Sequence, residues 1–507
     1  MLAIARNSSI RFLGLLTIAA MILPTACAQA RQPNIVFILA DDMGFGDVQA
    51  LNGDSRIPTP HIDSLARDGM TFTDAHTPSS VCTPTRYGTL TGRYCWRTRL
   101  KRGVLGGYSA PLIDADRRTV ATMLAANGYV TGAVGKWHLG MNMTSRQGNT
   151  VDDRWDGDGG VDFRKPIADG PTTRGFGYYF GVSASLDMAP YVWIENDHFA
   201  SLPTKQFPGQ SFPAFARKGP QADDLRFSEA LDDLVEKARD FIRANAQGER
   251  PFFLYLPLTG PHKPVAPHER FVGATELGPY GDFVVNVDNA VGRVLSVIDI
   301  AGISDETLVF FTSDNGSYMY RLDQADARDH VDDPAQQAFR ADRHRSNGPF
   351  RGTKADIWEA GHHVPFFARW HGQIAAGSRC DATICLTDLF ATAADLVGAK
   401  VADDEAEDSF SIAPLLRGKE MQPPRAPVIH HSAGGMFAIR EGQWKLVAGN
   451  GSGGRQSPKG KPFARPYHLY DLTADLGETT NLIDKHADVA KHLEAKLEAI
   501  RTGGRSR

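Results

Sequence analysis

Four short apolar runs, each followed by a polar cluster, constrain the fold of this 507-residue chain more than any other feature. The first run is Pro33 to Ala40, and the others are Tyr129 to Val134, Phe252 to Leu258 and Leu308 to Thr312. Mostly apolar runs without strict alternation are typical of strands that are buried on both faces of a parallel sheet. We therefore expect these four segments to be buried strands.

Segments with helical periodicity separate these runs. They are His61 to Asp68, Thr119 to Asn127, Asp224 to Ala246 and the stretch from Val287 to Ile298. A further strand is expected from Val364 to Trp370. Strands that alternate with helices imply an α/β fold, in which a large, mostly parallel sheet is sandwiched by helices.

From about Pro423 the pattern changes to that of a small antiparallel subdomain. Phe437 to Arg440 and Trp444 to Val447 resemble a hairpin, Tyr467 to Asp471 a third strand, and Val489 to Ile500 a terminal amphipathic helix. We therefore expect three parts. Residues 1–30 form a signal peptide, residues 31–422 the main α/β domain and residues 423–507 a C-terminal α+β subdomain.

The N-terminus has the features of an export signal. The apolar run Phe12 to Leu23 follows two arginines, and Ala28-Gln29-Ala30 fits the small-residue rule for signal cleavage. The run is shorter than the roughly 20 residues that a membrane span needs. A lipoprotein anchor on Cys27 is less favoured, because Pro24 occupies a position where such signals carry an aliphatic residue. The sequence thus predicts an exported protein, periplasmic or secreted, without a membrane span.

Composition and cysteine content narrow the class of protein further. With 42% hydrophobic and 22% charged residues, the composition is that of an ordinary globular protein. A net charge of -4 argues against a nucleic-acid partner, because a protein that binds nucleic acid would carry a basic surface. Cys380 and Cys385 could pair in an oxidising compartment. Cys95 then has no partner and is expected to be a small core residue.

Polar clusters follow the four strands at the end where open α/β sheets bind their ligands. Their members are Asp41, Asp42, Lys136, His138, His262, Asp314 and Asn315. Each cluster alone has an ordinary explanation as a turn, a solvated lysine or a hydrogen-bonded histidine. Their agreement in position favours one common site.

The donor types of this expected site indicate a hard divalent cation. Asp41, Asp42, Asp314 and Asn315 offer only oxygen donors, which suit calcium, whereas zinc prefers cysteine or histidine. Such a cation would polarise an anionic ester and align it with a nucleophile.

The segment from Val81 to Arg93, V-C-T-P-T-R-Y-G-T-L-T-G-R, supplies a candidate nucleophile in what we expect to be a Ser/Thr-rich turn. A lone cysteine is more often an ordinary buried thiol. The pattern Cys-x-Pro-x-Arg with Leu-Thr-Gly behind it closely resembles the signature of the formylglycine-dependent sulfatases. In that family the cysteine, here Cys82, is oxidised to an aldehyde whose hydrate is the nucleophile. Thr85 stands where the family usually has serine or alanine.

The resemblance covers nearly the whole mature chain. It includes the Asp pair after the first strand, G-K-W-H-L-G, Gly-Pro-His, S-D-N-G and R-G-T-K. It implies an alkaline-phosphatase-like fold and a maturation enzyme that generates formylglycine. It also implies that one calcium ion is held by the modified Cys82 together with Asp41, Asp42, Asp314 and Asn315.

By the same resemblance, five residues have catalytic roles. Arg86 and Lys136 steady the aldehyde hydrate, and His138 helps to release sulfate from it. His262 and Lys354 face the leaving oxygen. The mechanism is then covalent, with attack on sulfur by one hydroxyl of the hydrate and release of sulfate through the other.

The sequence constrains the identity of the substrate less than it constrains the type of reaction. The segment Gly181 to Asp187 resembles the family's sulfate-contacting loop, which makes Ser185 a sulfate contact and Asp187 a sugar contact. Two irregular insertions, Met141 to Gly175 and Tyr191 to Pro220, are expected to shape a substrate cleft. The cations of Trp96 to Lys101 could meet further sulfates or a uronate.

These features favour a sulfatase that acts on sulfated polysaccharides or oligosaccharides. The 6-sulfate of galactose or N-acetylgalactosamine is one expected position. Two alternatives stay open, namely a phosphonate or phosphodiester hydrolase of the same superfamily and a catalytically inactive glycan-binding relative.

Overall fold

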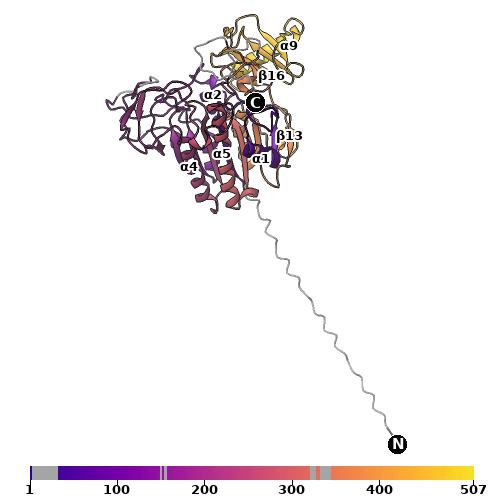
Figure 1. Ribbon diagram of the computed structural model, residues 1–507. Helices are drawn as coiled ribbons and strands as arrows, with labels where there is room; N and C mark the ends of the chain where they lie inside the picture. Colours follow the sequence, from indigo (N-terminus) through magenta and orange to yellow (C-terminus); the bar gives the residue numbers. More distant parts are fainter. Residues whose placement is uncertain (3–31, 149–150, 154–156, 320–326, 332–343) are drawn as a thin grey trace. The chain divides into compact units, whose positions relative to one another are not determined.

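A computed structural model of the chain describes residues 1–2, 32–148, 151–153, 157–319, 327–331 and 344–507 (Figure 1). The expected signal peptide, with Cys27, lies outside these residues except for its first two positions. None of the helices in the described ranges is long and apolar enough to span a membrane. Gln32–Arg507 clusters as one compact unit.

The centre of this unit is a sheet whose five middle strands are parallel. Their order is β11 (Thr307–Ser313), β1 (Asn34–Asp41), β10 (Phe252–Pro261), β4 (Val130–Lys136) and β5 (Tyr178–Val182). Nearly every residue of these strands is buried. The four apolar runs are therefore neighbouring core strands, and the predicted α/β fold is confirmed.

Both edges of the sheet depart from the parallel arrangement. On one side β12 (Phe366–Arg369) and β2 (Met70–Phe72) run antiparallel to their inner neighbours, and β13 (Ser378–Cys380) ends the sheet parallel to β2. On the other side β6 (Ile194–Glu195) and β7 (His198–Phe199) continue antiparallel. The complete sheet has 10 strands and is mixed.

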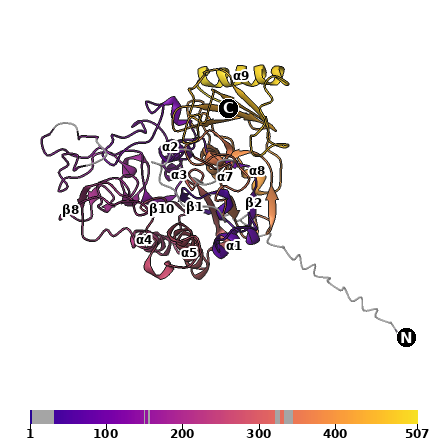
Figure 2. The same cartoon turned by 45° about the horizontal axis from the view of Figure 1, so that its top comes forward.

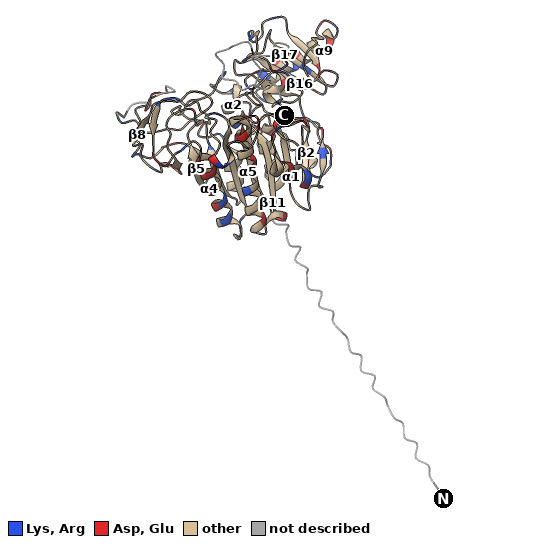
Figure 3. Ribbon diagram, in the orientation of Figure 1, with Lys and Arg blue, Asp and Glu red and all other residues tan. Residues whose placement is uncertain are grey.

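Helices cover the two faces of the sheet, as Figure 2 shows. One face carries α1 (Pro60–Asp68), α4 (Ala230–Asn245) and α5 (Pro279–Ile300). The other carries α2 (Cys82–Thr91), α3 (Val120–Ala126), α7 (Leu389–Val397) and the short α8 (Ala413–Leu416). Both α4 and α5 carry acidic and basic residues (Figure 3), and Arg293 of α5 pairs with Glu236 of α4.

Smaller elements correct two expectations about irregular segments. The Cys82 segment, expected as a turn, forms the helix α2. The insertion from Tyr191 to Pro220 contains β6, β7, β8 (Lys205–Phe207) and the start of β9 (Gly219–Gln221). The first insertion, in its described part, holds a short 3-10 helix at Pro171–Arg174 and two isolated β-bridges, which join Asn142 to Asp169 and Ser145 to Val161.

The C-terminal segment forms its own antiparallel sheet. It consists of β15 (Val428–His431), β16 (Phe437–Glu441), β17 (Trp444–Ala448) and β18 (His468–Asp471), with α9 (Ala487–Thr502) packed on it. Its apolar core includes two rings from the segment after α2, namely Tyr94 and Trp96. The C-terminal sheet therefore packs directly on the main α/β layers, and a domain boundary at residue 423 stays a prediction.

The cysteines are all free thiols in the described residues. Cys380 lies in β13 and Cys385 in β14 (Ile384–Cys385), which pairs with β3 (Ala75–His76) in a separate small sheet. Both are free thiols, so the suggested disulfide between them is not formed in this structure. Cys95 is a buried core residue, as expected.

Candidate active site

The carboxyl ends of the parallel strands bring the predicted polar clusters together. Asp41 is the last residue of β1, and Asp314 follows β11, its neighbour in the sheet. Asp42 and His138 adopt positive φ angles of 69° and 56°, one and two residues after the ends of β1 and β4. Non-glycine residues are uncommon in this region, and those that occur are concentrated at functional sites. The backbone thus turns sharply where the polar side chains gather.

Cys82 is the first residue of α2 and is almost completely buried. Its Sγ lies 3.6 Å from Asp41 Oδ1 and 3.4 Å from Lys354 Nζ. Burial raises the pKa of the Cys82 thiol to about 12, although Lys136 and Lys354 oppose the rise. An unmodified thiol here is therefore protonated at neutral pH and is a weak nucleophile.

Arg86 lies one helical turn after Cys82 and connects α2 to the strand ends. Its Nε and NH2 donate to Asp314 Oδ2 at 3.0 and 2.7 Å, and its NH1 donates to the Lys136 carbonyl at 2.9 Å. Burial opposes ionisation of Asp314, but Arg86 and the site lysines outweigh it and lower the pKa of that carboxyl. Asp314 is therefore a carboxylate held in place by Arg86.

Each of the first two aspartates contacts its own lysine. Lys136 Nζ lies 2.5 Å from Asp41 Oδ2, and Lys354 Nζ lies 2.5 Å from Asp42 Oδ1. Burial and then the neighbouring Asp314 raise the pKa of Asp41 to about 7. Burial therefore keeps Asp41 hard to ionise even beside its lysine, so that a further positive charge at the site would favour the carboxylate form of Asp41.

The donor set fits a metal ion. Asp41, Asp42, Cys82 and His262 present ligand atoms that lie within 4.8 Å of one another. Asn315 donates through Nδ2 to Asp42 Oδ1 at 2.7 Å, and its Oδ1 is buried without a hydrogen-bond partner. An unpartnered buried oxygen beside carboxylates is what a hard cation would satisfy. The predicted ligand set of Asp41, Asp42, Asp314 and Asn315 remains a prediction.

The two histidines of the site differ in which ring nitrogen contacts a backbone carbonyl. His138 Nε2 donates to the Leu105 carbonyl at 2.8 Å, so its Nδ1 is the acceptor, and that atom is buried without a partner. His262 Nδ1 faces the Lys263 carbonyl, and its Nε2 lies 3.6 Å from Asp42 Oδ2. Burial, followed by the nearby lysines, lowers the pKa of both rings well below the usual value. Both are neutral bases in this state.

The predicted substrate contacts lie at the same site. Ser185 Oγ is 3.2 Å from Lys136 Nζ and 3.0 Å from His262 Nδ1. Asp187 is buried and accepts a hydrogen bond from Arg217 NH1 at 2.6 Å, while its Oδ1 has no hydrogen-bond partner. The sequence analysis missed Arg217, because it lies in the second insertion without a motif around it.

Lys263 is a further residue beside the site, and its place after Gly-Pro-His could have revealed it. Its Nζ lies 4.7 Å from the centre of the Phe215 ring, on which the Arg217 guanidinium also packs at 5.1 Å. Burial lowers the pKa of Lys263 to about 8, against the opposing effect of Asp187. Cations therefore surround the approach to Asp187.

Comparison with known proteins agrees with this geometry. Residues 33–399 match the Sulfatase family. The chain is 32% identical to the N-acetylgalactosamine-6-O-sulfatase of Bacteroides thetaiotaomicron, over 93% of this chain and 94% of that one. It is 30% identical to human arylsulfatase A, over 96% and 92% of the two chains.

Comparison with solved structures also finds similarity to a sulfatase. A Bacteroides thetaiotaomicron sulfatase from a locus for the metabolism of multiple glycosaminoglycans superposes with a TM-score of 0.79 at 30% identity, covering 93% of this chain and 100% of that one. The phosphonate monoester hydrolase of Agrobacterium radiobacter has a TM-score of 0.58 at 19% identity, over 93% and 96% of the chains. The latter likeness concerns the fold alone.

Proposed function

The chain belongs to the sulfatase family, the hydrolases of sulfate esters, and from this premise we propose that it removes sulfate from carbohydrates through a nucleophile made from Cys82. The observation that carries the proposal is the placement of Cys82. It is buried at the start of α2, beside Asp41 and Lys354. The main enzyme alternative is hydrolysis of a phosphonate or phosphodiester, and the structural likeness to such an enzyme is one of fold only.

We infer that Cys82 is converted to formylglycine by a maturation enzyme. Its hydrated aldehyde supplies one hydroxyl for attack on sulfur and a second whose deprotonation releases sulfate. The raised pKa of the Cys82 thiol supports this inference, because the unmodified side chain would be a weak nucleophile. Since Cys82 is buried, the maturation enzyme must reach it before the chain has finished folding.

We infer further that one calcium ion is held by Asp41, Asp42, Asp314 and Asn315 together with residue 82. When bound, it polarises a sulfate oxygen as a Lewis acid. The unpartnered Asn315 Oδ1 and the raised pKa of Asp41 support a cation here. Arg86 keeps Asp314 ionised and oriented toward this site.

The site lysines stabilise negative charge on the sulfuryl group during its transfer. Lys136 ends β4, whereas Lys354 lies in a loop, and each is fixed by a carboxylate. Because they are buried and fixed before the substrate arrives, they require little reorganisation during the reaction. Burial opposes the charged form of Lys354, but the carboxylates of Asp42, Asp41 and Asp314 raise its pKa, so that it stays an ammonium.

Two histidines move protons. His138 accepts a proton at Nδ1 when sulfate is released, since its Nε2 is committed to the Leu105 carbonyl. His262 and Lys354 protonate the leaving oxygen of the sugar. Burial and then the lysines lower the pKa of His262, and an arriving sulfate offsets the lysine charge, so that this ring gains a proton when substrate binds.

The substrate proposal is a 6-sulfated galactose or N-acetylgalactosamine unit, met by Ser185 and Asp187 in an exported enzyme. It is supported by the curated relative that acts on N-acetylgalactosamine 6-sulfate. A panel of defined sugar sulfates, an aryl sulfate and a phosphonate monoester, compared by kcat/KM, tests it. We expect a 6-sulfated sugar to have the highest kcat/KM. Turnover of the phosphonate alone would contradict the proposal, and turnover of the aryl sulfate alone would contradict its carbohydrate part.

A further inference from the structure

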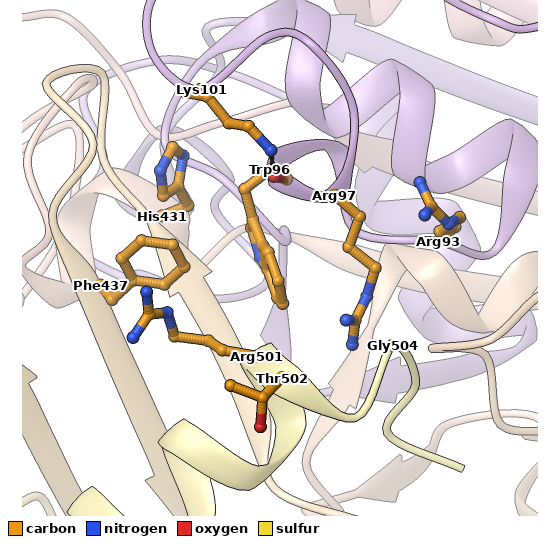
Figure 4. Close-up of a pocket in the computed structure, with 9 residues that line it drawn as sticks. All are labelled: Arg93, Trp96, Arg97, Lys101, His431, Phe437, Arg501, Thr502 and Gly504. Carbon is orange, nitrogen blue, oxygen red and sulfur yellow. Dashed lines mark hydrogen bonds between the residues drawn. The ribbon is translucent and has the colours of Figure 1, made fainter.

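A cavity of about 450 Å³ lies between the segment that follows α2 and the helix α9 (Figure 4). We call it the α2–α9 cavity. Its volume is within the range of roughly 300–1,000 Å³ that is typical of small-molecule sites. Nine residues line it, namely Arg93, Trp96, Arg97, Lys101, His431, Phe437, Arg501, Thr502 and Gly504. None of these is acidic and four are arginine or lysine, so the lining presents positive charge to a ligand.

The guanidinium groups of Arg93 and Arg97, on one side of the cavity, are held in place by carboxylates. Arg97 donates through Nε and NH2 to both oxygens of Asp408 at 2.8 Å, and it lies 4.3 Å above the Trp96 ring. Arg93 donates to Glu407 at 3.0 Å. These contacts hold the two arginines before any ligand binds, which lowers the entropy cost of binding.

The positive charges of Lys101 and Arg501, on the other side of the cavity, are less neutralised by nearby carboxylates. Lys101 Nζ donates to the Trp96 carbonyl at 2.7 Å, and in the described part of the chain no carboxylate lies within 4 Å of it. Arg501 of α9 pairs with Glu498 at 2.6 Å on the surface, where ion pairs are weak. A bound oxyanion would therefore gain its strongest net attraction from Lys101 and Arg501.

Aromatic rings form the rest of the wall. Trp96 and Phe437 meet edge to face at 5.4 Å, and the half-exposed Phe463 packs on Phe437 at 5.5 Å. The Trp96 indole N–H is buried and has no hydrogen-bond partner. The faces of these rings are covered within the protein, because Tyr94 stacks on Trp96 while Arg97 and Arg501 lie over Trp96 and Phe437. The rings therefore position the cations, and the N–H groups of the arginines and of Lys101 are the donors that can meet the acidic and hydroxyl oxygens of a sugar. An inorganic anion alone would leave most of this volume to water.

The cavity adjoins the reaction site through the backbone. The His431 carbonyl accepts hydrogen bonds from Ser79 Oγ at 2.8 Å and from Ser80 N at 3.0 Å, three and two residues before Cys82. The Ser80 carbonyl in turn accepts from Ala355 N at 2.9 Å, next to Lys354. One wall of the cavity is thus built on the loop that leads into the nucleophile helix.

We propose that the α2–α9 cavity binds a sulfate or carboxylate group of a carbohydrate chain, as a second saccharide site outside the reaction site. The choice of a carbohydrate rests on the proposed function, whereas the anionic character of the ligand rests on the lining residues. The site favours polymeric or oligomeric substrates over single sugars, because a chain held here dissociates more slowly from the enzyme.

Binding to the full chain with Cys82→Ala, which blocks turnover, tests the proposal by calorimetry. The probe is a tetrasaccharide that carries N-acetylgalactosamine 6-sulfate and uronate, with inorganic sulfate as a second probe. Lys101→Ala with Arg501→Ala should weaken one binding event by about tenfold or more. Arg67→Ala with Arg243→Ala removes two exposed, ion-paired cations elsewhere and should leave binding unchanged.

In the enzyme with intact Cys82, the Lys101→Ala/Arg501→Ala pair should raise KM for the tetrasaccharide and leave kcat and KM for a monosaccharide sulfate unchanged. Unchanged tetrasaccharide binding would overturn the proposal. So would inorganic sulfate that binds as tightly as the tetrasaccharide, because the site would then be one for a free anion. If no sugar sulfate is hydrolysed but the tetrasaccharide still binds through Lys101 and Arg501, the proposed function fails and this proposal stands.

Discussion

At the scale of single residues, the chemistry depends on which polar atoms already have a hydrogen-bond partner. His138 has one nitrogen bound to the Leu105 carbonyl and one buried without a partner, so it can take a proton only at Nδ1. Asn315 has its amide hydrogen on Asp42 and its oxygen unpartnered. Such incomplete hydrogen bonding is costly in a buried site and therefore points to a ligand or a transferred proton.

Replacing His138 tests its role as proton acceptor. We expect His138→Asn, which tolerates the positive φ of this position, to lower kcat by roughly 10²–10⁴-fold with little change in thermal stability. Burial lowers the pKa of His138 below its ordinary value of 6.5, so protonation of this ring should reduce kcat only below pH 6.5. Sulfate release measured against pH checks both points. An unchanged kcat in the variant would contradict the role.

At the scale of elements, the strand ends were predictable and the helix α2 was not. Buried parallel strands leave a clear apolar signal, and their polar ends must meet at one edge of the sheet. The segment after Val81 instead contains proline, glycine and several threonines, which are typical of turns. Pro84 is compatible with a helix only because it lies in the first turn, where its missing N–H is not needed.

The α2–α9 cavity could not be predicted from the sequence, for a different reason. Its cations were visible as the run from Trp96 to Lys101, but Phe437 and Arg501 lie more than 330 residues further along the chain. Only the packing of the C-terminal sheet on the segment after α2 brings them together. The short edge strands β2, β6, β7 and β13 were also missed, because strands of two or three residues carry no periodic signal.

A buried ion pair joins the C-terminal sheet to the main layers. Lys445 of β17 lies 3.0 Å from Glu359, the first residue of α6 (Glu359–His362), and 2.8 Å from Glu478, and all three side chains are inaccessible to solvent. We expect Lys445→Met to lower the free energy of unfolding by roughly 3–5 kcal/mol, because it leaves buried carboxylates unpaired. Urea denaturation measures this. The exposed Lys459→Met is the control, and equal stability of both variants would contradict the assignment.

At the scale of the whole molecule, stability should depend on calcium. Three carboxylates converge at the strand ends, and a cation that binds only the folded state stabilises it. We expect chelation to lower both the melting temperature and the activity, and elemental analysis to find one calcium ion. Exhaustive chelation that changes neither, or the presence of zinc instead, would contradict the ligand assignment.

The effect of chelation should also depend on pH. Without the cation, burial and Asp314 raise the pKa of Asp41 to about 7, above its ordinary value of 3.8. A raised carboxyl pKa means that the folded state binds the proton more tightly, so stability is present at acid pH and is lost as pH rises through 7. We therefore expect chelation to lower the melting temperature more at pH 7.5 than at pH 5. Calorimetry at both values, with and without chelator, decides this.

The central claim is that a nucleophile made from Cys82 hydrolyses sulfate esters, and one measurement tests it most directly. The peptide that contains Cys82 is analysed by mass spectrometry in the same preparation whose sulfate release is measured, beside Cys82→Ala and Cys82→Ser. We predict that activity follows the fraction of formylglycine, and that both variants fold but release no sulfate. Full activity in a preparation with only unmodified thiol at Cys82 would contradict the account.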